Sequence, residues 1–175
     1  RELVEDARIR FKSAATEQVH VIWRTRPRNV LLLKKKGPEL ASLLDDVARW
    51  LTEEEKMNVL VEPPVARELP HLQGYTQSQE GVLDEIIDFV VCLGGDGLIL
   101  HAAQLFKNAV PPIVSFALGS LGFLTVFDIK DYKEEVRRVI AGDFGVSLRM
   151  RLHCTLHKNG QPTTGKVFQA LNEVV

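Results

Sequence analysis

The chain has 175 residues, of which 45% are hydrophobic and 26% are charged, enough for one well-buried globular domain and part of a second. Its net charge of −1 excludes a global basic field for nucleic acid or anionic membranes, and its two cysteines are too few for a disulfide framework or a cysteine-based zinc site. No apolar run approaches the roughly 20 residues that span a bilayer, so we expect a soluble intracellular protein in a reducing compartment, without nucleic-acid or membrane partners.

The residues before Gly145 alternate between helical and buried-strand patterns. Apolar residues at helical spacing predict an amphipathic helix over Glu2–Gln18. The same spacing predicts further helices at Pro38–Thr52, Leu98–Phe106 and Tyr132–Ala141. Short continuous apolar runs predict buried strands at Val30–Leu33, Val59–Val61, Phe89–Leu93 and Ile113–Phe116, and residues 65–81 lack periodicity and are predicted as loop. This alternation favours an α/β fold, a Rossmann-like open parallel sheet with flanking helices on both faces.

A different pattern begins near Gly145. Apolar and polar residues alternate strictly over Leu148–His157, which predicts a half-exposed antiparallel strand. Asn159-Gly160 is a strong turn signal, and Lys166–Val175 is predicted as the return strand, within which the chain ends. Because a two-stranded ribbon is marginal alone, we expect the truncated start of an antiparallel β domain. The expected organisation is a helical extension over residues 1–28, an α/β nucleotide-binding domain over 29–144 and this β-rich segment over 145–175.

The strongest chemical signal is the loop Gly94-Gly95-Asp96-Gly97, which leaves a predicted strand and enters a helix. In open parallel sheets, ligands bind beyond the carboxyl ends of the strands. Glycines there let the backbone approach a phosphate, and a helix N-terminus supplies unpaired N–H groups. An ionised Asp96 can orient an attacking hydroxyl or accept its proton, or hold Mg²⁺ through water. The alternative is a tight turn in which Asp96 caps the helix.

Other nucleotide motifs are incomplete, and three more segments carry candidate residues. The chain has no Walker A sequence, and a leucine replaces the last glycine of the dinucleotide fingerprint, which weakens a dehydrogenase interpretation. Gly119–Thr125 permits a tight turn that could offer Phe123 to an adenine ring, or a connection with Phe123 in the core. Asn172 and Glu173 suit ribose hydroxyls and an adenine amine, or an exposed ribbon edge. Lys34-Lys35-Lys36 either lends charge to a phosphate or is solvated surface.

Taken together and in this order, Leu93–Gly97, Gly119–Thr125 and Asn172–Val175 closely resemble the NAD kinase family, with similarity from about Asn29 onward. The first motif is shared with diacylglycerol kinases, sphingosine kinases and phosphofructokinases, whereas the second and third together are more specific. Residues Glu55–Pro63 look most like plant and algal members. The resemblance implies ATP-dependent phosphorylation of the 2′-hydroxyl on the adenosine ribose of NAD, giving NADP, with Mg²⁺ bridging the phosphates of ATP.

The resemblance also assigns roles to residues of this chain. Asp96 matches the catalytic aspartate that activates the hydroxyl. The implied binding residues are Gly94 and Gly95 near the transferred phosphates, Gly97 at the dinucleotide, His101 at an often basic position, Phe123 beside the adenine, and Asn172 and Glu173 on the nucleoside. No residue is assigned as a protein ligand to metal. Leu98 departs from the threonine that many members carry after the loop.

Partners and activity follow from the same resemblance. The family completes its site between subunits and places further contacts after the Asn-Glu pair, so we expect a homo-oligomer for the full-length protein. For this chain alone we expect weak nucleotide binding and little kinase activity. A basic N-terminal helix could recruit calmodulin, with packing on the domain as the alternative, and the compartment is the cytoplasm or the plastid stroma. The competing functions are a lipid or sugar kinase and a nucleotide-binding regulatory module.

Overall fold

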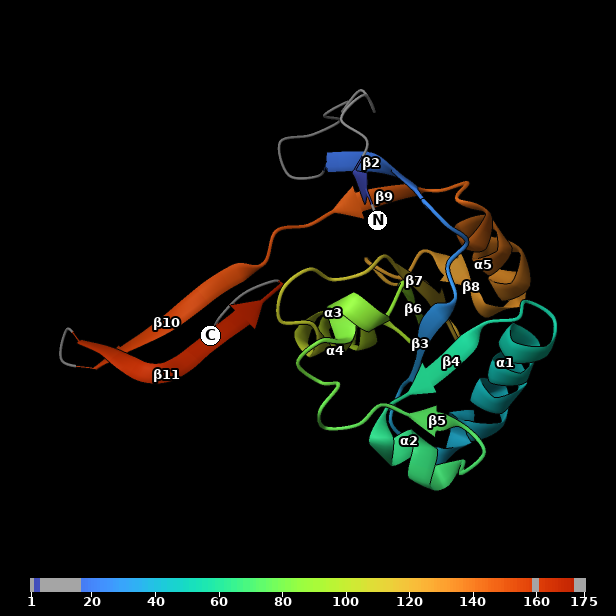
Figure 1. Cartoon of the computed structure of the whole chain (residues 1–175), viewed down its shortest axis with the longest axis horizontal. Helices are drawn as coiled ribbons and strands as arrows, with labels where there is room; N and C mark the ends of the chain where they lie inside the picture. Colours follow the sequence, from blue (N-terminus) through green and yellow to red (C-terminus); the bar gives the residue numbers. More distant parts are fainter. Residues whose placement is uncertain (1, 4–16, 159–160, 172–175) are drawn as a thin grey trace. The chain divides into compact units, whose positions relative to one another are not determined.

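The computed structural model describes residues 2–3, 17–158 and 161–171 and divides into two compact units (Figure 1). Residues 22–144 form the first unit, and residues 145–171 belong to the second together with residues 17–21. None of the described helices is both long and apolar enough to cross a bilayer.

A six-stranded sheet of order β5-β4-β3-β6-β7-β8 forms the centre of the first unit, and each neighbouring pair is parallel. The strands are β3 (Asn29–Lys34), β4 (Asn58–Val61), β5 (Gln73–Gly74), β6 (Phe89–Leu93), β7 (Ile113–Ala117) and β8 (Phe127–Asp128). Every residue of β6 is buried, as expected for a strand covered on both faces. The open parallel sheet predicted from the apolar runs is therefore confirmed.

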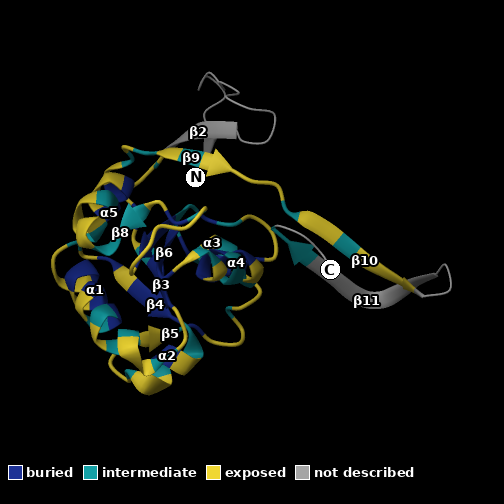
Figure 2. Ribbon diagram, turned by 180° about the vertical axis from the view of Figure 1, so that it is seen from behind, coloured by how far each residue is buried: buried dark blue, intermediate teal, exposed yellow. Residues whose placement is uncertain are grey.

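Helices cover both faces of this sheet, and alternate strand residues serve the two cores (Figure 2). Val30 and Leu32 pack with α1 (Ala41–Glu53) and α5 (Tyr132–Ala141). Leu31 and Leu33 pack on the opposite side with α3 (Leu83–Ile86) and α4 (Asp96–Leu105). The helices predicted over Pro38–Thr52, Leu98–Phe106 and Tyr132–Ala141 are confirmed as α1, α4 and α5. A 3₁₀ turn, η1 (Pro38–Leu40), precedes α1, and α4 begins at Asp96 rather than Leu98.

The prediction of a loop over residues 65–81 is wrong in part. Helix α2 (Pro63–Glu68) occupies its start, and β5 adds an edge strand within it. The two prolines that end β4 also start this helix, because the fixed φ of proline suits the first helical turn. Val65 then buries itself in the core, with Leu69 packed alongside. Three short elements, α3, β8 and the 3₁₀ turn η2 (Ile129–Asp131), were not predicted because they span too few residues to show periodicity.

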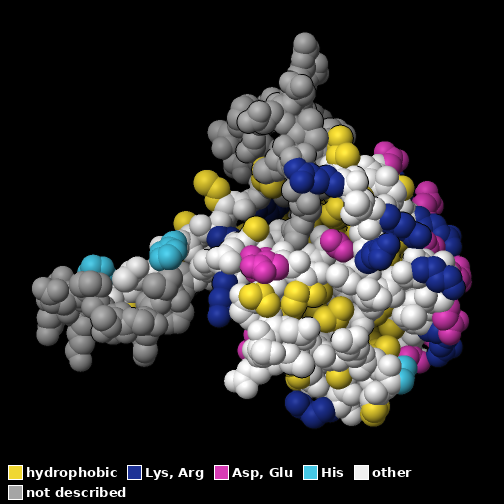
Figure 3. All heavy atoms as spheres, in the orientation of Figure 1, with side chains coloured by type: hydrophobic (Ala, Val, Ile, Leu, Met, Phe, Trp, Pro, Cys, Tyr) yellow, Lys and Arg dark blue, Asp and Glu magenta, His cyan; other side chains and the backbone are white. Residues whose placement is uncertain are grey.

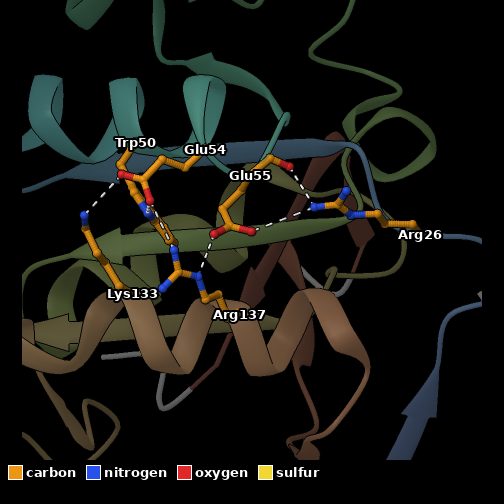
Figure 4. Close-up of polar contacts among 6 residues, drawn as sticks. All are labelled: Arg26, Trp50, Glu54, Glu55, Lys133 and Arg137. Atoms are coloured by element: carbon orange, nitrogen blue, oxygen red, sulfur yellow. Dashed lines mark hydrogen bonds and ion pairs between the residues drawn. The ribbon is translucent and has the colours of Figure 1, made fainter.

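Charged and aromatic side chains join α1 to α5 (Figure 4). Arg137 Nε donates to Glu55 Oε1 at 2.7 Å, and its Nη2 donates to Glu54 Oε2 at 3.2 Å. Both Arg137 and Lys133 lie over the ring of Trp50, at 5.5 and 5.6 Å from its centroid. Basic and acidic side chains are interspersed over the two helices (Figure 3), so the basic groups are neutralised locally.

The second unit contains two small antiparallel pairings. Strand β2 (Glu17–Ile22) pairs with β9 (Gly145–Leu148), in a sheet of order β1-β2-β9 whose third member is β1 (Glu2–Leu3). Strand β10 (Leu152–Lys158) pairs with β11 (Gln161–Ala170). The helix predicted over Glu2–Gln18 is contradicted at both described ends, which are strands, and its remainder lies outside the described residues.

The strand predicted over Leu148–His157 is interrupted. Residues 149–151 separate β9 from β10 because the two segments pair with different partners, β2 and β11. The predicted Asn159-Gly160 turn lies outside the described residues, although the register pairs Lys158 with Gln161 on either side of it. The return strand starts at Gln161 instead of Lys166.

Candidate active site

Two glycine-containing loops lie at the same edge of the parallel sheet. Gly94–Gly97 follows β6 and enters α4, while Gly119–Thr125 follows β7. Strands β6 and β7 are parallel neighbours, with Leu93 paired to Phe116. The Gly94 N–H extends this pairing by donating to the Phe116 carbonyl at 3.0 Å. Both loops therefore leave the carboxyl ends of adjacent strands, where ligands bind in open α/β sheets.

The two loops meet at the carboxylate of Asp96. Its Oδ2 accepts a hydrogen bond from the Phe123 N–H at 2.8 Å. Its Oδ1 accepts from the Leu124 N–H, the Thr125 N–H and the Thr125 hydroxyl, each at 3.0 Å. The Gly122 N–H donates to the Thr125 carbonyl at 3.1 Å and closes the turn. Successive N–H groups in a turn form a concavity for an anion, and here the anion that occupies it is the side chain of Asp96.

These contacts contradict the alternative in which Asp96 caps its helix. The N-cap residue of α4 is Gly95, and Asp96 is the first helical residue. The hydrogen bonds that the structure gives to the Asp96 side chain all come from residues 123–125 and none from α4. Asp96 therefore joins two loops, and helix capping does not explain its presence.

The turn that surrounds Asp96 keeps it ionised. Partial burial raises the pKa of Asp96, but hydrogen bonds from the Leu124 N–H, the Thr125 hydroxyl and the Phe123 N–H lower it, and the net result is a pKa below the ordinary value of 3.8. Its place in the first turn of α4 adds the favourable end of the helix dipole. A carboxylate at this position carries full negative charge at neutral pH and can accept hydrogen bonds from a ligand hydroxyl.

The structural reasons for a glycine differ between positions in the two loops. A Cβ at Gly122 would collide with Asp96 Oδ1 and lie 2.7 Å from Asp96 Cγ. Gly94 has φ +157°, a conformation that side chains rarely adopt, and a Cβ there would lie 3.2 Å from Leu98 Cδ2. At Gly95 and Gly97, no atom outside the adjacent residues and the local helix backbone lies within 4 Å of the position that a Cβ would take. Space beside Asp96 is therefore open at both flanking residues.

Apolar side chains on the 118–126 segment face solvent. Phe123 is 83% exposed, and Leu121 and Val126 are each 60% exposed. The alternative in which Phe123 belongs to the core is therefore wrong. Phe123 thus combines an exposed aromatic ring with a backbone N–H that bonds the ionised Asp96 carboxylate. This combination suits a ligand with both an apolar ring and hydroxyl groups.

Behind the loop, an acidic residue that was not predicted contacts His101. The Nε2 atom of His101, in the second turn of α4, lies 2.8 Å from Glu62 Oε1. Glu62 directly follows β4 and so belongs to the same carboxyl edge of the sheet. A lone acidic residue immediately after a buried strand was the available sequence signal. The pair fixes the orientation of the His101 ring.

The remaining predicted residues differ in their surroundings. Lys34 is buried, and its Nζ bonds the Gly37 carbonyl at 2.7 Å and Glu68 Oε2 at 3.1 Å, so it is committed to the fold. Lys35 and Lys36 are exposed. Asn172 and Glu173 lie outside the described residues. Within the described part of the chain, no group of three or more His, Cys, Asp and Glu side chains could hold a metal ion.

Comparison with known proteins identifies relatives of this chain. The family model for the ATP-NAD kinase N-terminal domain matches residues 29–144. The chain is 45% identical to NAD kinase 2, chloroplastic, of Arabidopsis thaliana and 47% identical to the probable NAD kinase 2, chloroplastic, of Oryza sativa subsp. japonica. Each similarity covers the whole chain but only 19% of the relative's length.

A solved structure shares the fold. The crystal structure of yeast NADH kinase complexed with NADH superimposes with a TM-score of 0.74 at 31% identity, over 89% of this chain and 50% of the yeast chain. The family model matches residues 29–144, and the plant relatives match over the whole chain. The chain therefore belongs to the ATP-NAD kinase family.

Proposed function

We propose that this chain supplies the Asp96 site for ATP-dependent phosphorylation of the 2′-hydroxyl on the adenosine ribose of NAD. The observation that carries the proposal is the ionised Asp96 carboxylate, held by residues 123–125 at the carboxyl edge of the sheet. The names of the relatives, NAD kinase and NADH kinase, supply the substrate.

The proposed reaction balances without another reactant. The ribose oxygen attacks the γ-phosphorus of ATP, an O–P bond forms, and the bond from that phosphorus to the β,γ-bridging oxygen breaks. ADP leaves with the electron pair, and Asp96 accepts the proton of the hydroxyl and passes it to solvent. The products are NADP, ADP and a proton. Because the transferred group has a loose transition state, positioning and charge stabilisation supply most of the catalysis.

The other predicted residues take binding roles in this proposal. Gly94, Gly95 and Gly97 let phosphates and the dinucleotide approach the N-terminus of α4, which the open space at Gly95 and Gly97 supports. The exposed ring of Phe123 contacts the adenine. His101 lies one turn further along α4, and its bond to Glu62 orients it. Asn172 and Glu173 are proposed to hold the nucleoside.

Mg²⁺, assembly and location complete the proposal. In this proposal Mg²⁺ arrives with ATP and neutralises its phosphate charge. We further propose that the full-length protein is a homo-oligomer, and that its nucleotide-binding domain spans residues 29–144 and is followed by a β-rich domain from residue 145. Similarity to relatives named chloroplastic favours the plastid stroma over the cytoplasm. Calmodulin binding stays a prediction, because most of the N-terminal segment lies outside the described residues.

The test is NADP formation from NAD, ATP and Mg²⁺ by the 175-residue chain and by a version extended through the second domain. We expect turnover only from the extended version. Asp96→Asn should reduce its kcat by roughly a hundredfold or more, since a general base contributes about 10²–10⁴-fold, while NAD binding persists. If the extended version binds NAD and makes no NADP, the kinase role is wrong and a binding or regulatory role replaces it.

A further inference from the structure

The two oxygens of Asp96 have different surroundings. Oδ1 accepts hydrogen bonds from the Leu124 N–H, the Thr125 N–H and the Thr125 hydroxyl. Among the described residues, Oδ2 accepts one bond, from the Phe123 N–H. A carboxylate has about four acceptor sites over its two oxygens. Oδ1 is therefore saturated, whereas Oδ2 keeps the capacity to accept one more donor.

Thr125 contributes two of the bonds to Oδ1, one from its backbone and one from its side chain. The residue is fully buried, so water does not compete for its hydroxyl. Its branched Cβ restricts χ1 and keeps the hydroxyl aimed at the carboxylate. Among the donors on Asp96, the Thr125 hydroxyl is the one that a side-chain substitution removes, since the others are backbone N–H groups.

We propose that Thr125 is a positioning residue that anchors Oδ1 of Asp96 and thereby presents Oδ2 to the acceptor hydroxyl of the substrate. The identity of the acceptor rests on the proposed function, whereas the anchoring does not. Asp96 is only partly buried, and the positions that a Cβ of its neighbours Gly95 and Gly97 would take are unoccupied. In the reaction, Oδ2 accepts the proton that the hydroxyl loses, while Oδ1 stays bonded to the turn.

The anchoring has a signature that does not depend on activity. Burial raises the pKa of Asp96, and the hydrogen bonds of residues 123–125, the Thr125 hydroxyl among them, lower it. Loss of that hydroxyl should move the titration of Asp96 to higher pH. A residue that merely fills space would leave this titration where it is.

The first measurement is a ¹³C NMR titration of the Asp96 carboxyl in the 175-residue chain. Thr125→Val keeps the shape and removes the hydroxyl, while Thr125→Ser keeps the hydroxyl. We expect a higher titration midpoint in Thr125→Val and an almost unchanged midpoint in Thr125→Ser. Ser115→Ala is the control, because it removes a buried hydroxyl of β7 that does not bond to Asp96. Equal midpoints for the native chain and Thr125→Val would overturn the anchoring.

The second measurement is NADP formation by the extended version carrying the same substitutions. Thr125→Val should reduce kcat by roughly ten- to a hundredfold, the effect of a small misplacement of a reacting group, with little change in the KM for NAD. Thr125→Ser should restore most of the loss. An unchanged kcat, or a change in KM alone, would overturn the positioning role. If the Asp96 titration shifts as expected but the extended version makes no NADP, the proposed function is contradicted. Thr125 then anchors Asp96 only structurally, and the positioning role proposed for it is overturned.

Discussion

Gly122 lies directly against Asp96, although 26 positions separate them in the chain. A Cβ at position 122 would stand 2.7 Å from Asp96 Cγ and would collide with Oδ1. The neighbouring N–H groups, from Phe123 to Thr125, can surround the carboxylate because Gly122 has no side chain to occupy the same space. The absence of a side chain at Gly122 thus determines where the Asp96 carboxylate can lie.

Gly122→Ala should displace the Asp96 carboxylate and weaken its bonds to the turn. A partly buried charged group that loses hydrogen bonds costs about 1–3 kcal/mol, so the free energy of unfolding in urea should fall by that amount. Gly119→Ala is the matched control, because no atom outside the adjacent residues lies within 4 Å of a Cβ at that position. Equal losses for the two variants would show that the contact with Asp96 is not what requires Gly122.

The stability contributed by Asp96 should depend on pH in a defined direction. Its pKa in the folded chain is lowered from 3.8, so the ionised form is favoured by folding. The contribution is fully present above about pH 4 to 5 and is lost as the pH falls through the folded-state pKa. The difference in unfolding free energy between the native chain and Asp96→Asn should therefore be constant near neutrality and shrink on acidification.

Urea unfolding of both chains between about pH 7 and pH 3 measures this difference. The comparison with Asp96→Asn is needed because Asp45 and Asp128 also have lowered pKa values and contribute to acid sensitivity in both chains. A difference that grows as the pH falls would contradict the direction of the pKa shift.

The central strands were predictable because each is a continuous apolar run. Every residue from Val30 to Leu33 and from Phe89 to Leu93 is buried, and burial on both faces leaves no polar position that would disguise the pattern. Helix α1 was equally clear, since one face carries the residues that enter the core. These elements depend on local sequence, and so their limits were close to the observed ones.

The site was predictable only in its parts. The glycines and Asp96 could be recognised, but the contact between Asp96 and Thr125 depends on β6 and β7 being neighbours, a tertiary property that no local pattern states. The bond between Glu62 and His101 escaped for the same reason. Helical spacing likewise misled at Glu17 and Gln18, which belong to β2, where pairing with β9 outweighs the local preference.

Arg137 should stabilise the fold in a way that salt can screen. Its guanidinium bonds Glu55 at 2.7 Å and Glu54 at 3.2 Å and lies over Trp50. Arg137→Met should lower the thermal midpoint modestly at low ionic strength, and the difference should narrow at high salt. Arg137→Lys should restore only part of it, because an ammonium cannot reach both carboxylates with the same planar fork.

Lys130→Met is the control for this experiment. Lys130 has one ion pair, to Asp128 at 3.4 Å, and its side chain is 83% exposed, so its loss should change the midpoint less. If the Arg137 difference is independent of salt, the contact with the Trp50 ring outweighs the ion pairs.

The two cysteines should react with thiol reagents at different rates. Cys92 lies within β6 with no exposed surface, and burial, with a smaller contribution from Glu62, raises the pKa of its thiol. Because the thiolate is the reactive form, Cys92 should stay unmodified by iodoacetamide until the first unit unfolds. Cys154 is partly exposed on β10 and should react in the native chain.

Mass spectrometry of peptides after brief labelling, with and without urea, measures both sites, and Cys154→Ser isolates Cys92. Native labelling of Cys92 as fast as that of Cys154 would mean that the parallel sheet opens readily around β6, which would contradict this prediction.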